Sequence, residues 1–346
     1  MSEKVLVTGA SGYIAGWVVK FLLEEGYIVN ATVRDRNNLQ KIQHLVDLQI
    51  KYPQKLNLFD ADLLKTGSFK ESMKDCDYVI HTASPFVISG IKDPQKELVD
   101  PALEGTRNVL NTVNETQSVK RVVLTSSVVS IYGDAVDLED TRNNIFDETI
   151  WNTTSSLSHQ PYSYSKKLAE KEAWKIQSEQ NRWDLVTINP GFVFGPSLSN
   201  RADSTSVDFM INMLNGKLKT GVPKLNFGVV DVRNVARAHI NAIKNQEAKG
   251  RYILVNETIS MKDIADILCK KYGNKYPIPK NVLPNALIYL SAPFIGFTWK
   301  YIKRNIDKPL IFDNKRSKTE LSINYSKSEQ TILDHAEQII DANLIK

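Results

Sequence analysis

The chain has 346 residues, 42% of them hydrophobic and 24% charged, which is long enough for about two domains with a substantial core. Its 44 basic and 39 acidic residues are spread along the sequence, so the net charge of +5 forms no basic block that would indicate a nucleic-acid partner. The two cysteines, Cys76 and Cys269, lie far apart without Cys-x-x-Cys or histidine-rich spacing, which argues against a disulfide framework and a metal site and indicates a reducing cytosol.

The first half of the chain alternates short apolar runs with longer helical patterns. The chain enters a strand at once, so we expect no signal peptide and a cytoplasmic protein. Strands are predicted at residues 4–8, 28–33, 55–61, 78–83, 121–127 and 184–190. Helices are predicted near residues 12–25, 37–49, 66–74, 93–116 and 160–180. This repeated order predicts an α/β fold with a doubly wound parallel sheet of the Rossmann type.

Beyond Pro190 this alternation ends. Residues 191–227 are rich in loop residues, residues 227–243 contain a short strand and a helix, and another strand is predicted at 251–255. We therefore assign residues 1–190 to a nucleotide-binding Rossmann domain, to which 228–255 return. The remaining segments, 191–227 and 256–346, are assigned to a smaller mixed substrate-binding lobe.

One apolar segment, residues 282–299, raises the question of membrane contact. Pro284 and Pro293 interrupt it and Asn285 lies within it, so we expect no integral membrane segment but buried helices of the second lobe. Peripheral membrane association stays open as the alternative.

A glycine-rich turn, VTGASGYIAG at residues 7–16, joins the first strand to the first helix. Gly9 allows the tight turn, Gly12 allows the backbone to approach a pyrophosphate, and Ala15 allows close packing of helix on sheet. The start of the helix directs unpaired N–H groups and its positive dipole end at the phosphates. A strand before and an amphipathic helix after this turn predict a dinucleotide site. The turn residues assigned to it are Gly9, Ser11, Gly12, Tyr13 and Ile14.

The end of the second strand selects the cofactor. NAD sites usually carry an acidic residue there for the ribose 2′-hydroxyl, whereas this chain has Arg34, whose guanidinium can bind a 2′-phosphate through two hydrogen bonds. Asp35 leaves the hydroxyl-binding alternative open. Lys41 is a second phosphate ligand if the following loop folds back. We expect NADPH.

The stretch HQPYSYSKKLAE, residues 159–170, holds two tyrosines and two lysines. On a helix over 160–180, Tyr162 and Lys166 share a stripe with small and apolar residues, and Tyr164 and Lys167 share one with cationic and hydrophilic residues. Spacing admits either pair, but amphipathicity favours Tyr162 and Lys166 on the inward face. A nearby ammonium favours the phenolate, so Tyr162 can exchange a proton with a substrate oxygen.

The third catalytic group is expected to be a hydroxyl at the end of the fifth strand, in LTSS. Strand alternation directs only one of Ser126 and Ser127 toward the cleft, and we choose Ser127. The predicted catalytic residues are thus Ser127, Tyr162 and Lys166, without a metal.

Taken together, the motifs resemble the extended short-chain dehydrogenase/reductases. The segments concerned are TGASGYIA, ATVRD, FDADL, HTASPF, LEGTRNVL, VVLTSS, YSYSKKLAEKEAW, NPGFVFGP, VDVRNVARAHI and FDNKRSKTELSINY, which span essentially the whole chain. They look most like the branch that contains dihydroflavonol reductases, cinnamoyl-CoA reductases and microbial aldehyde and methylglyoxal reductases.

The resemblance implies roles for further residues. Lys166 would also hold the nicotinamide ribose, and Arg34 and Lys41 would bind the 2′-phosphate. The other implied cofactor neighbours are Asp62 and Leu63 at the adenine, Thr82, Ala83 and Ser84 beside the cofactor, Pro190 and Val193 at the nicotinamide, and Ser206 over it. The implied substrate residues are Phe86, Ser127, Tyr132 and Tyr162.

Departures from the family pattern concern the substrate. Tyr132, in SIYG, stands where plant dihydroflavonol reductases carry an asparagine, and YSYSKK replaces the Asn-Trp-Tyr-Cys-type signature of cinnamoyl-CoA reductases. These differences imply a smaller or less polar carbonyl compound.

We expect a monomer or homodimer that reduces an aldehyde or ketone to the alcohol with NADPH, Tyr162 donating the proton. The alternatives are a nucleotide-sugar epimerase or dehydratase that retains NAD, a cofactor-sensing regulator without activity, and a membrane-associated sterol-type dehydrogenase suggested by 282–299.

Overall fold

The computed structural model describes residues 3–84, 90–199, 204–292 and 297–345. Its main feature is a seven-stranded sheet in which every pairing is parallel. The strands, in spatial order, are β3 (Leu56–Asp60), β2 (Ile28–Val33), β1 (Lys4–Thr8), β4 (Tyr78–His81), β5 (Arg121–Thr125), β6 (Asp184–Pro190) and β9 (Gly250–Leu254). The strand order reverses between β1 and β4, which is where doubly wound sheets bind ligands. The predicted fold class is confirmed.

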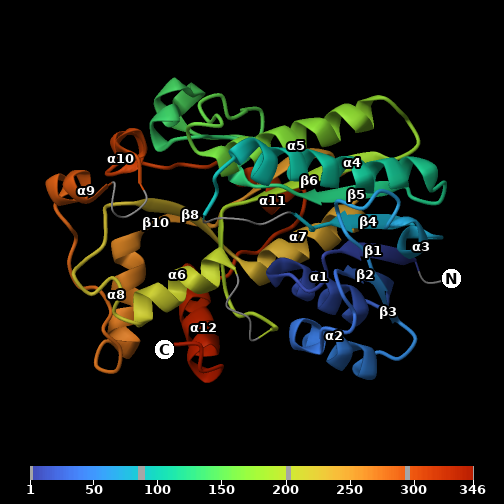
Figure 1. The fold of residues 1–346 in the computed structure, drawn as a ribbon, viewed down its shortest axis with the longest axis horizontal. Coiled ribbons are helices and arrows are strands. Elements are labelled where there is room, and N and C mark those ends of the chain that lie inside the picture. The colour runs from blue at the N-terminus through green and yellow to red at the C-terminus, as the bar shows by residue number, and fades with distance from the viewer. Residues whose placement is uncertain (1–2, 85–89, 200–203, 293–296, 346) are drawn as a thin grey trace.

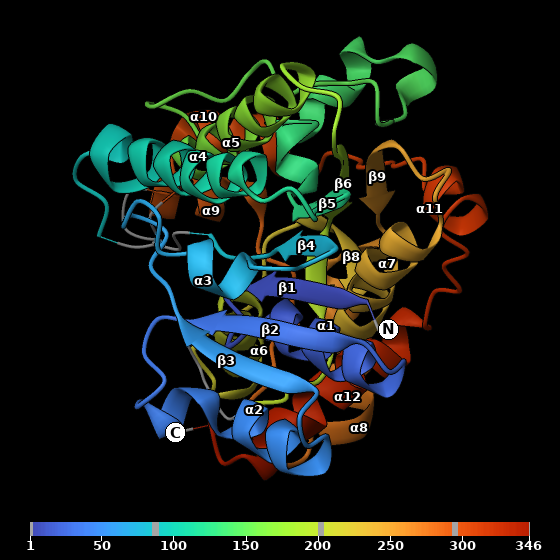
Figure 2. The ribbon, with the colours of Figure 1, turned by 90° about the vertical axis from the view of Figure 1, so that its right-hand side faces the viewer.

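Helices cover both faces of this sheet (Figures 1 and 2). One face carries α1 (Tyr13–Glu24), α2 (Leu39–Lys51) and α7 (Val232–Lys244), and the other carries α3 (Lys70–Met73), α4 (Asp100–Glu115) and α5 (Pro161–Ser178). Within β1, Val5 and Val7 join the apolar core on the α1 side, whereas Leu6 joins the core on the α4 side. Strand alternation thus requires apolar residues at successive positions of a sheet covered on both faces.

The second part of the molecule contains a three-stranded sheet in the order β10 (Glu257–Ser260), β8 (Asn226–Asp231) and β7 (Phe192–Phe194). It packs with α6 (Thr205–Leu214), α8 (Met261–Tyr272) and α12 (Ser328–Asp341) around a separate apolar core. Thus β8 belongs to the small sheet, whereas α7 and β9, which follow it, belong to the nucleotide-binding layers.

Short elements complete the fold. A π-helical segment, Gln95–Val99, leads into α4, and 3-10 turns occur at Val128–Ser130, Ala135–Asp140 and Arg142–Asn144. The C-terminal part adds α9 (Asn285–Ser291), α10 (Trp299–Asn305) and α11 (Lys315–Thr319).

The prediction of buried helices over 282–299 is wrong for most of the positions that the structure describes. Leu287, Leu290 and Trp299 are 53%, 74% and 65% exposed. Among the residues of this segment whose burial the structure describes, only Ile288 and Ala292 are buried, in the core between α9 and α10. Apolar residues at successive positions of a helix lie on all of its sides. The short α9 packs against other elements along one side only, so its other apolar side chains stay exposed. No helix in the described ranges is long and apolar enough to cross a bilayer.

Candidate active site

The glycine turn lies at the carboxyl edge of β1. Gly9 has a φ of +65°, and a Cβ there would lie 2.9 Å from the Cα of Ala83, two residues after the end of β4, so only glycine fits. The Gly12 N–H donates to the Gly9 carbonyl at 2.9 Å, and Gly12 then caps α1. The backbone N–H groups at the start of α1 are consequently presented at the edge where the strand order reverses.

The side chains that follow the glycines are engaged within the protein. The Tyr13 hydroxyl donates to the Gly195 carbonyl at 2.5 Å and its ring stacks on His335 at 5.9 Å, and burial raises the pKa of Tyr13. Ile14 packs against the apolar core, and Ser11 is half-buried. Tyr13 therefore joins the turn to the second part of the molecule, which leaves its backbone as the group available to a phosphate.

Arg34, at the end of β2, is exposed and forms no ion pair or hydrogen bond with any residue that the structure describes. The neighbouring carboxylate, Asp35, accepts the Asn37 N–H at 2.8 Å and so closes its own turn. Arg36, which we had not singled out, donates from Nε to Asp60 Oδ2 at 3.0 Å and fixes the ends of β2 and β3. Lys41 is exposed in the first turn of α2. Arg34 and Lys41 are thus the cations left available for a phosphate.

The loop after β3 is held from α4. Asp62 Oδ1 accepts the Leu64 N–H at 2.9 Å, and Asn108 on α4 donates to the Leu63 and Lys65 carbonyls, each at 2.9 Å. The roles of Asp62 and Leu63 at the adenine stay predictions. Asn108 was missed, because an asparagine inside a helix carries no local signature.

The segment after β4 is tied back to β1. The Ala83 N–H donates to Thr8 Oγ1 at 3.1 Å, the Thr82 hydroxyl donates to the Thr8 carbonyl, and Thr8 Oγ1 lies 2.8 Å from His81 Nδ1. Burial, and then the charge of Lys166, lower the pKa of His81 to about 3. His81 is therefore neutral at ordinary pH and holds the segment after β4 against β1.

Tyr162 and Lys166 lie one turn apart on α5, beside this segment. Lys166 Nζ donates to Ser84 Oγ at 2.9 Å and lies 5.7 Å from the centre of the Tyr162 ring. Burial lowers the pKa of Lys166 to about 8 and raises the pKa of Tyr162 to about 12. Near pH 7 both groups keep their protons, so Tyr162 carries a proton to donate. Burial outweighs the lowering of the Tyr162 pKa that we expected from the nearby ammonium.

Tyr164 and Lys167 form a separate pair, with Lys167 Nζ 4.6 Å from the centre of the Tyr164 ring. Farther along their stripe Lys171 and Lys175 are exposed, whereas the Tyr162 stripe ends in the buried Ala173. The two pairs therefore lie on different sides of α5, although the chemical choice between them stays a prediction.

The adjacent serines after β5 point to different partners. Ser126 is buried and its hydroxyl donates to the carboxylate of Glu170. Ser127 is half-buried, and its Oγ accepts the Val129 N–H at 3.3 Å at the start of a 3-10 turn. Only the Ser127 hydroxyl can still donate to a ligand.

Glu170, the centre of a buried polar network, was missed. It accepts from Arg251 Nε at 2.6 Å, Ser130 Oγ at 2.5 Å and Asn189 Nδ2 at 2.8 Å. Asn189 Nδ2 also donates to the Ser127 carbonyl at 3.1 Å. The network therefore supports the backbone of Ser127, and the only sequence signal was the position of Glu170 four residues after Lys166 on one helix.

The remaining predicted site residues lie in different surroundings. Tyr132 stacks on Phe146 at 4.9 Å, and burial raises its pKa. Pro190 and Val193 are buried at the end of β6 and in β7, and Ser206 is buried in the first turn of α6. Phe86 lies outside the described residues. The structure thus brings together Gly9, Ala83, Ser84, Tyr162 and Lys166, while the roles of all the predicted site residues stay predictions.

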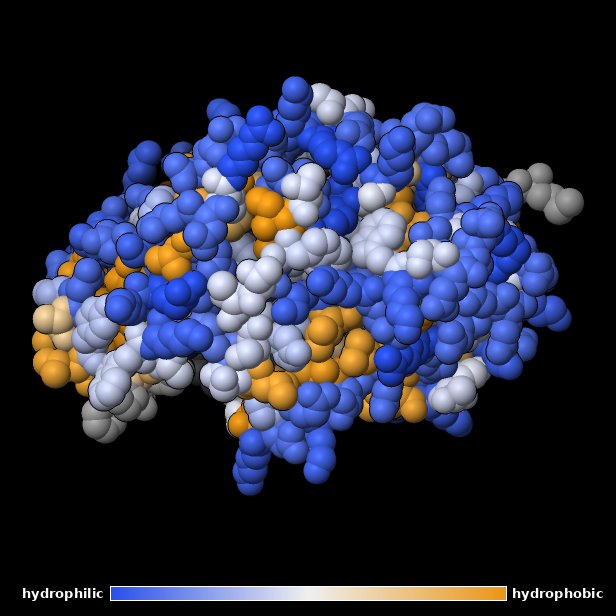
Figure 3. Space-filling model, turned by 90° about the horizontal axis from the view of Figure 1, so that it is seen from above, coloured by the Kyte–Doolittle hydropathy of each residue, from blue (hydrophilic) through white to orange (hydrophobic). Residues whose placement is uncertain are grey.

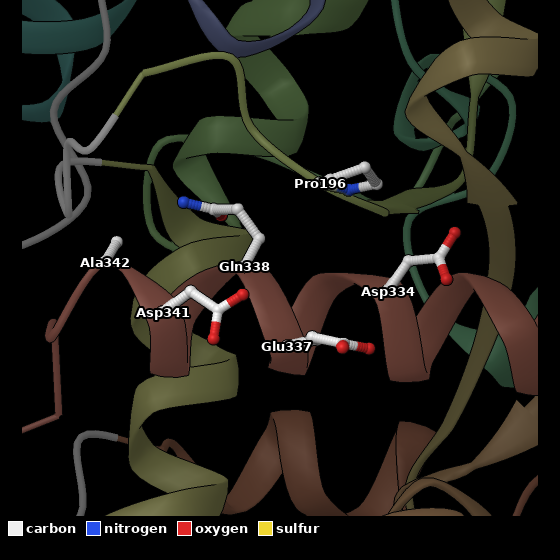
Figure 4. Close-up of a pocket in the computed structure, with 6 residues that line it drawn as sticks. All are labelled: Pro196, Asp334, Glu337, Gln338, Asp341 and Ala342. Carbon is white, nitrogen blue, oxygen red and sulfur yellow. The ribbon is translucent and has the colours of Figure 1, made fainter.

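Two depressions differ in their suitability for a phosphate ligand. The larger one runs along α12 and is lined by Pro196, Asp334, Glu337, Gln338, Asp341 and Ala342 (Figure 4). Its carboxylates do not suit an anion, and Asp334 and Glu337 already pair with Arg233 and Lys271 at 2.7 and 3.0 Å. The smaller cavity adjoins Lys166 and Ser84, on the side of the predicted chemistry.

Comparison with known proteins gives consistent matches. The model of the NAD-dependent epimerase/dehydratase family matches residues 5–256. Cinnamoyl-CoA reductase CAD2 of Medicago truncatula is 45% identical over 275 residues, 79% of this chain and 82% of that protein. The crystal structure of Gre2 from Candida albicans in complex with NADPH is 31% identical, with a TM-score of 0.79 over 98% of this chain and 99% of that one. Yeast methylglyoxal/isovaleraldehyde reductase Gre2 complexed with NADPH is 29% identical, with a TM-score of 0.80 over 99% and 100%.

Proposed function

This chain belongs to the NAD-dependent epimerase/dehydratase family, and on that premise we propose that it is an oxidoreductase that uses NADPH to reduce an aldehyde or ketone to the alcohol. The observation that carries the proposal is the pair of half-buried side chains Tyr162 and Lys166 beside Ser84, at the edge of the sheet that also holds the glycine turn. The relatives named as reductases, and those solved with NADPH, support it.

The residues present fit NADPH. The approach of Gly9 to Ala83 leaves backbone rather than side chains at the phosphate turn, and the start of α1 provides N–H donors. Arg34 carries an exposed guanidinium at the ribose end of β2, while Asp35 is occupied by its own turn. Arg34 and Lys41 would bind the 2′-phosphate, and Lys166 would hold the nicotinamide ribose.

The catalytic roles follow from the protonation of the site. When bound, NADPH supplies the hydride. Ser127 and Tyr162 would bind the carbonyl oxygen, and Tyr162 would donate its proton as negative charge develops there. The Lys166 ammonium would stabilise the phenolate that remains and so lower the cost of that transfer.

The substrate class is inferred from the surroundings of Tyr132. Its ring forms a cluster with Phe146 and Phe312, with ring centres 4.9 and 5.5 Å away, at the position where the resemblance places an asparagine in plant dihydroflavonol reductases. An aromatic wall favours an apolar carbonyl compound over a polyhydroxylated flavonoid. We expect a small or weakly polar aldehyde or ketone, and a cytosolic enzyme.

The proposal is tested by following NADPH absorbance with the purified protein and a panel of carbonyl compounds. We expect oxidation of NADPH that depends on the carbonyl compound, is lost in Tyr162→Phe and persists in the matched control Tyr164→Phe. Activity lost in Tyr164→Phe but kept in Tyr162→Phe would overturn the assignment of the donor. Tightly retained NAD and interconversion of a nucleotide sugar without net NADPH oxidation would instead support the epimerase alternative.

A further inference from the structure

The segment that leads into the catalytic helix is held by one buried carboxylate. Asp134 is fully buried and accepts from His159 Nε2 at 2.8 Å, Gln160 Nε2 at 2.7 Å, Arg304 Nε at 2.6 Å and Asn305 Nδ2 at 2.7 Å. His159 and Gln160 directly precede α5, whereas Arg304 and Asn305 end α10 in the second part of the molecule. A single carboxylate thus joins two distant parts of the chain.

Gln160 shows why this junction matters for Tyr162, two residues later. Its backbone has a φ of 55°, in the left-handed region that non-glycine residues seldom adopt. Besides its bond to Asp134, its side-chain amide donates to the Gly133 carbonyl. A backbone in this region is retained only where its surroundings hold it, and here Asp134 and Gly133 do so.

A second carboxylate, that of Asp137, holds the turn after the predicted substrate residue Tyr132. Asp137 accepts the Gly133 and Asp134 N–H groups at 3.0 and 2.9 Å, and Arg304 Nη2 reaches Asp137 at 2.8 Å. The turn after Tyr132 and the start of α5 therefore form one hydrogen-bonded unit with the end of α10.

We propose that Asp134 is a positioning residue, which sets the place of Tyr162 relative to the turn after Tyr132 through Gln160 and Arg304. This inference rests on the proposed function, because Tyr162 acts there as the proton donor. Asp134 is fully buried and occupied by four donors, so it acts through other residues.

The test compares Asp134→Asn with the matched control Asp184→Asn, in which Arg121 loses its carboxylate partner. Arg121 and Asp184 are the first residues of β5 and β6, at the edge of the sheet away from the predicted site. A displacement of about 1 Å at the reacting atoms can cost roughly a hundredfold in rate, so we expect kcat to fall tenfold to a hundredfold in Asp134→Asn. KM for NADPH should change less than about twofold, because the cofactor is bound by other elements, and Asp184→Asn should lower thermal stability with little change in kcat.

Three outcomes keep the test decisive. A wild-type protein without carbonyl-dependent NADPH oxidation contradicts the proposed function, whereas an active wild type with an equally active Asp134→Asn contradicts only the positioning role. Equal losses of kcat in Asp134→Asn and Asp184→Asn would also overturn it. If Asp134→Asn does not fold, His159→Gln removes one of the four bonds, and the same loss of kcat at constant KM for NADPH is expected, smaller in size.

A second inference rests on a different surface. Leu287, Tyr289, Leu290 and Trp299 are 53%, 40%, 74% and 65% exposed, and we call these four residues the α9–α10 surface. Figure 3 shows hydrophobic side chains at the end of the molecule where α9 and α10 lie in Figure 1. Trp299 Nε1 donates to the Tyr289 carbonyl at 3.1 Å, which joins the two helices across the surface.

Along the chain, the segment that carries this surface has charges of one sign, while Asp137 of the neighbouring 3-10 turn pairs with Arg304 at 2.8 Å. Between Asp266 and Asp307 the chain has no acidic residue. The cations in this interval are Lys270, Lys271, Lys275, Lys280, Lys300, Lys303 and Arg304. The first two and the last pair with carboxylates of other segments, whereas the exposed Lys280, Lys300 and Lys303 have no carboxylate partner in the ranges that the structure describes.

We infer that the α9–α10 surface binds an anionic lipid bilayer peripherally. Trp and Tyr rings and Leu side chains enter the headgroup region, and neighbouring lysines are attracted to lipid phosphates, each contributing roughly fivefold to the partition coefficient. A second copy is disfavoured, because a two-fold interface on this surface would enclose Lys300 and Lys303 of both subunits, and the segment from 267 to 306 has no carboxylate to pair with them.

The test is sedimentation of the full chain with phosphatidylserine/phosphatidylcholine vesicles and with phosphatidylcholine vesicles at low salt. The double variants Leu290→Gln/Trp299→Gln and Lys300→Glu/Lys303→Glu should each reduce binding to the anionic vesicles at least tenfold. The control Leu157→Gln, at an exposed leucine before α5, should bind these vesicles like the wild type. Absence of binding, or equal binding to neutral vesicles, overturns the inference. A dimer in light scattering that Leu290→Gln/Trp299→Gln disrupts, without vesicle binding, would assign the surface to a second copy instead.

Discussion

Replacement of Glu170 by glutamine tests the buried network beneath Ser127. The Glu170 carboxylate has no exposed surface and forms an ion pair with Arg251, whose side chain is 7% exposed, at 2.6 Å. Glutamine keeps the volume and one acceptor oxygen but removes the charge. The guanidinium of Arg251 would then retain its bonds to the Ile150 and Glu148 carbonyls at 2.6 and 3.0 Å and lose its only carboxylate in the described network.

The expected loss of stability follows from this burial. Removal of one partner of a buried ion pair costs about 3–5 kcal/mol, and the retained carbonyl bonds place Glu170→Gln at the lower end, about 3 kcal/mol. Glu170→Ala also leaves the Ser126, Ser130 and Asn189 donors without their acceptor, so we expect about 5 kcal/mol. Losses of this size are a large part of a typical unfolding free energy of about 5–15 kcal/mol.

Denaturant unfolding followed by circular dichroism measures this free energy. The matched control is Glu172→Gln, two residues along α5, where the carboxylate pairs with Arg107, 48% exposed, at 2.7 Å. A pair this open to solvent contributes about 0–1 kcal/mol, so Glu172→Gln should resemble the wild type. Equal losses in the two variants, or a loss under about 1 kcal/mol in Glu170→Gln, would refute the reasoning.

Three further predictions concern the site itself. Arg34→Ala should raise KM for NADPH by about tenfold or more and KM for NADH by less than about twofold, because only NADPH carries the 2′-phosphate. Steady-state kinetics with both cofactors measures these values, and an equal rise in the two KM values would contradict the role of Arg34 at the 2′-phosphate. Burial lowers the pKa of Lys166 to about 8, so the Lys166 ammonium is lost as the pH rises through that value. The value of kcat/KM for NADPH should therefore be level below about pH 8 and fall above it. A profile that stays level to about pH 10 would contradict this prediction. Ser127→Ala should lower kcat by about a hundredfold, since it removes a donor to the developing oxyanion. Ser126→Ala should mainly lower stability, because the Ser126 hydroxyl donates to Glu170. If kinetics and unfolding show the reverse pattern, the catalytic role belongs to Ser126.

Local sequence patterns were sufficient to predict the strands and the glycine turn of the nucleotide-binding half. The strands from β1 to β6 lie where β-branched apolar runs predicted them, because a strand buried on both faces needs apolar residues at every position. The glycine turn was recognised for the same reason, since the left-handed φ of Gly9 and the contact with Ala83 admit no side chain. On α5, helical periodicity separated Tyr162 and Lys166 from Tyr164 and Lys167 without knowledge of any contact.

Local patterns failed where the second part of the molecule begins. Residues 191–227 were expected to be loop-rich, yet they contain α6, whose buried Val207, Met210 and Met213 recur at helical spacing behind the capping hydroxyl of Ser204. Residues 282–299 were expected to be buried, but the hydrophobicity of a segment does not determine how many faces of its helix pack against other elements. Packing against Leu225, Ile302 and Ile306 covers one side of α9 and leaves Leu290 exposed.

The sequence by itself determined the fold class, and it predicted the cofactor turn and the inward face of α5, because each depends on residues a few positions apart. Only the tertiary structure decided what supports them. Glu170 meets Arg251 across 81 positions of the chain, and Asp134 meets Arg304 across 170. A buried carboxylate has meaning only through the donors that surround it, and no spacing along the chain predicts which distant donors will reach it.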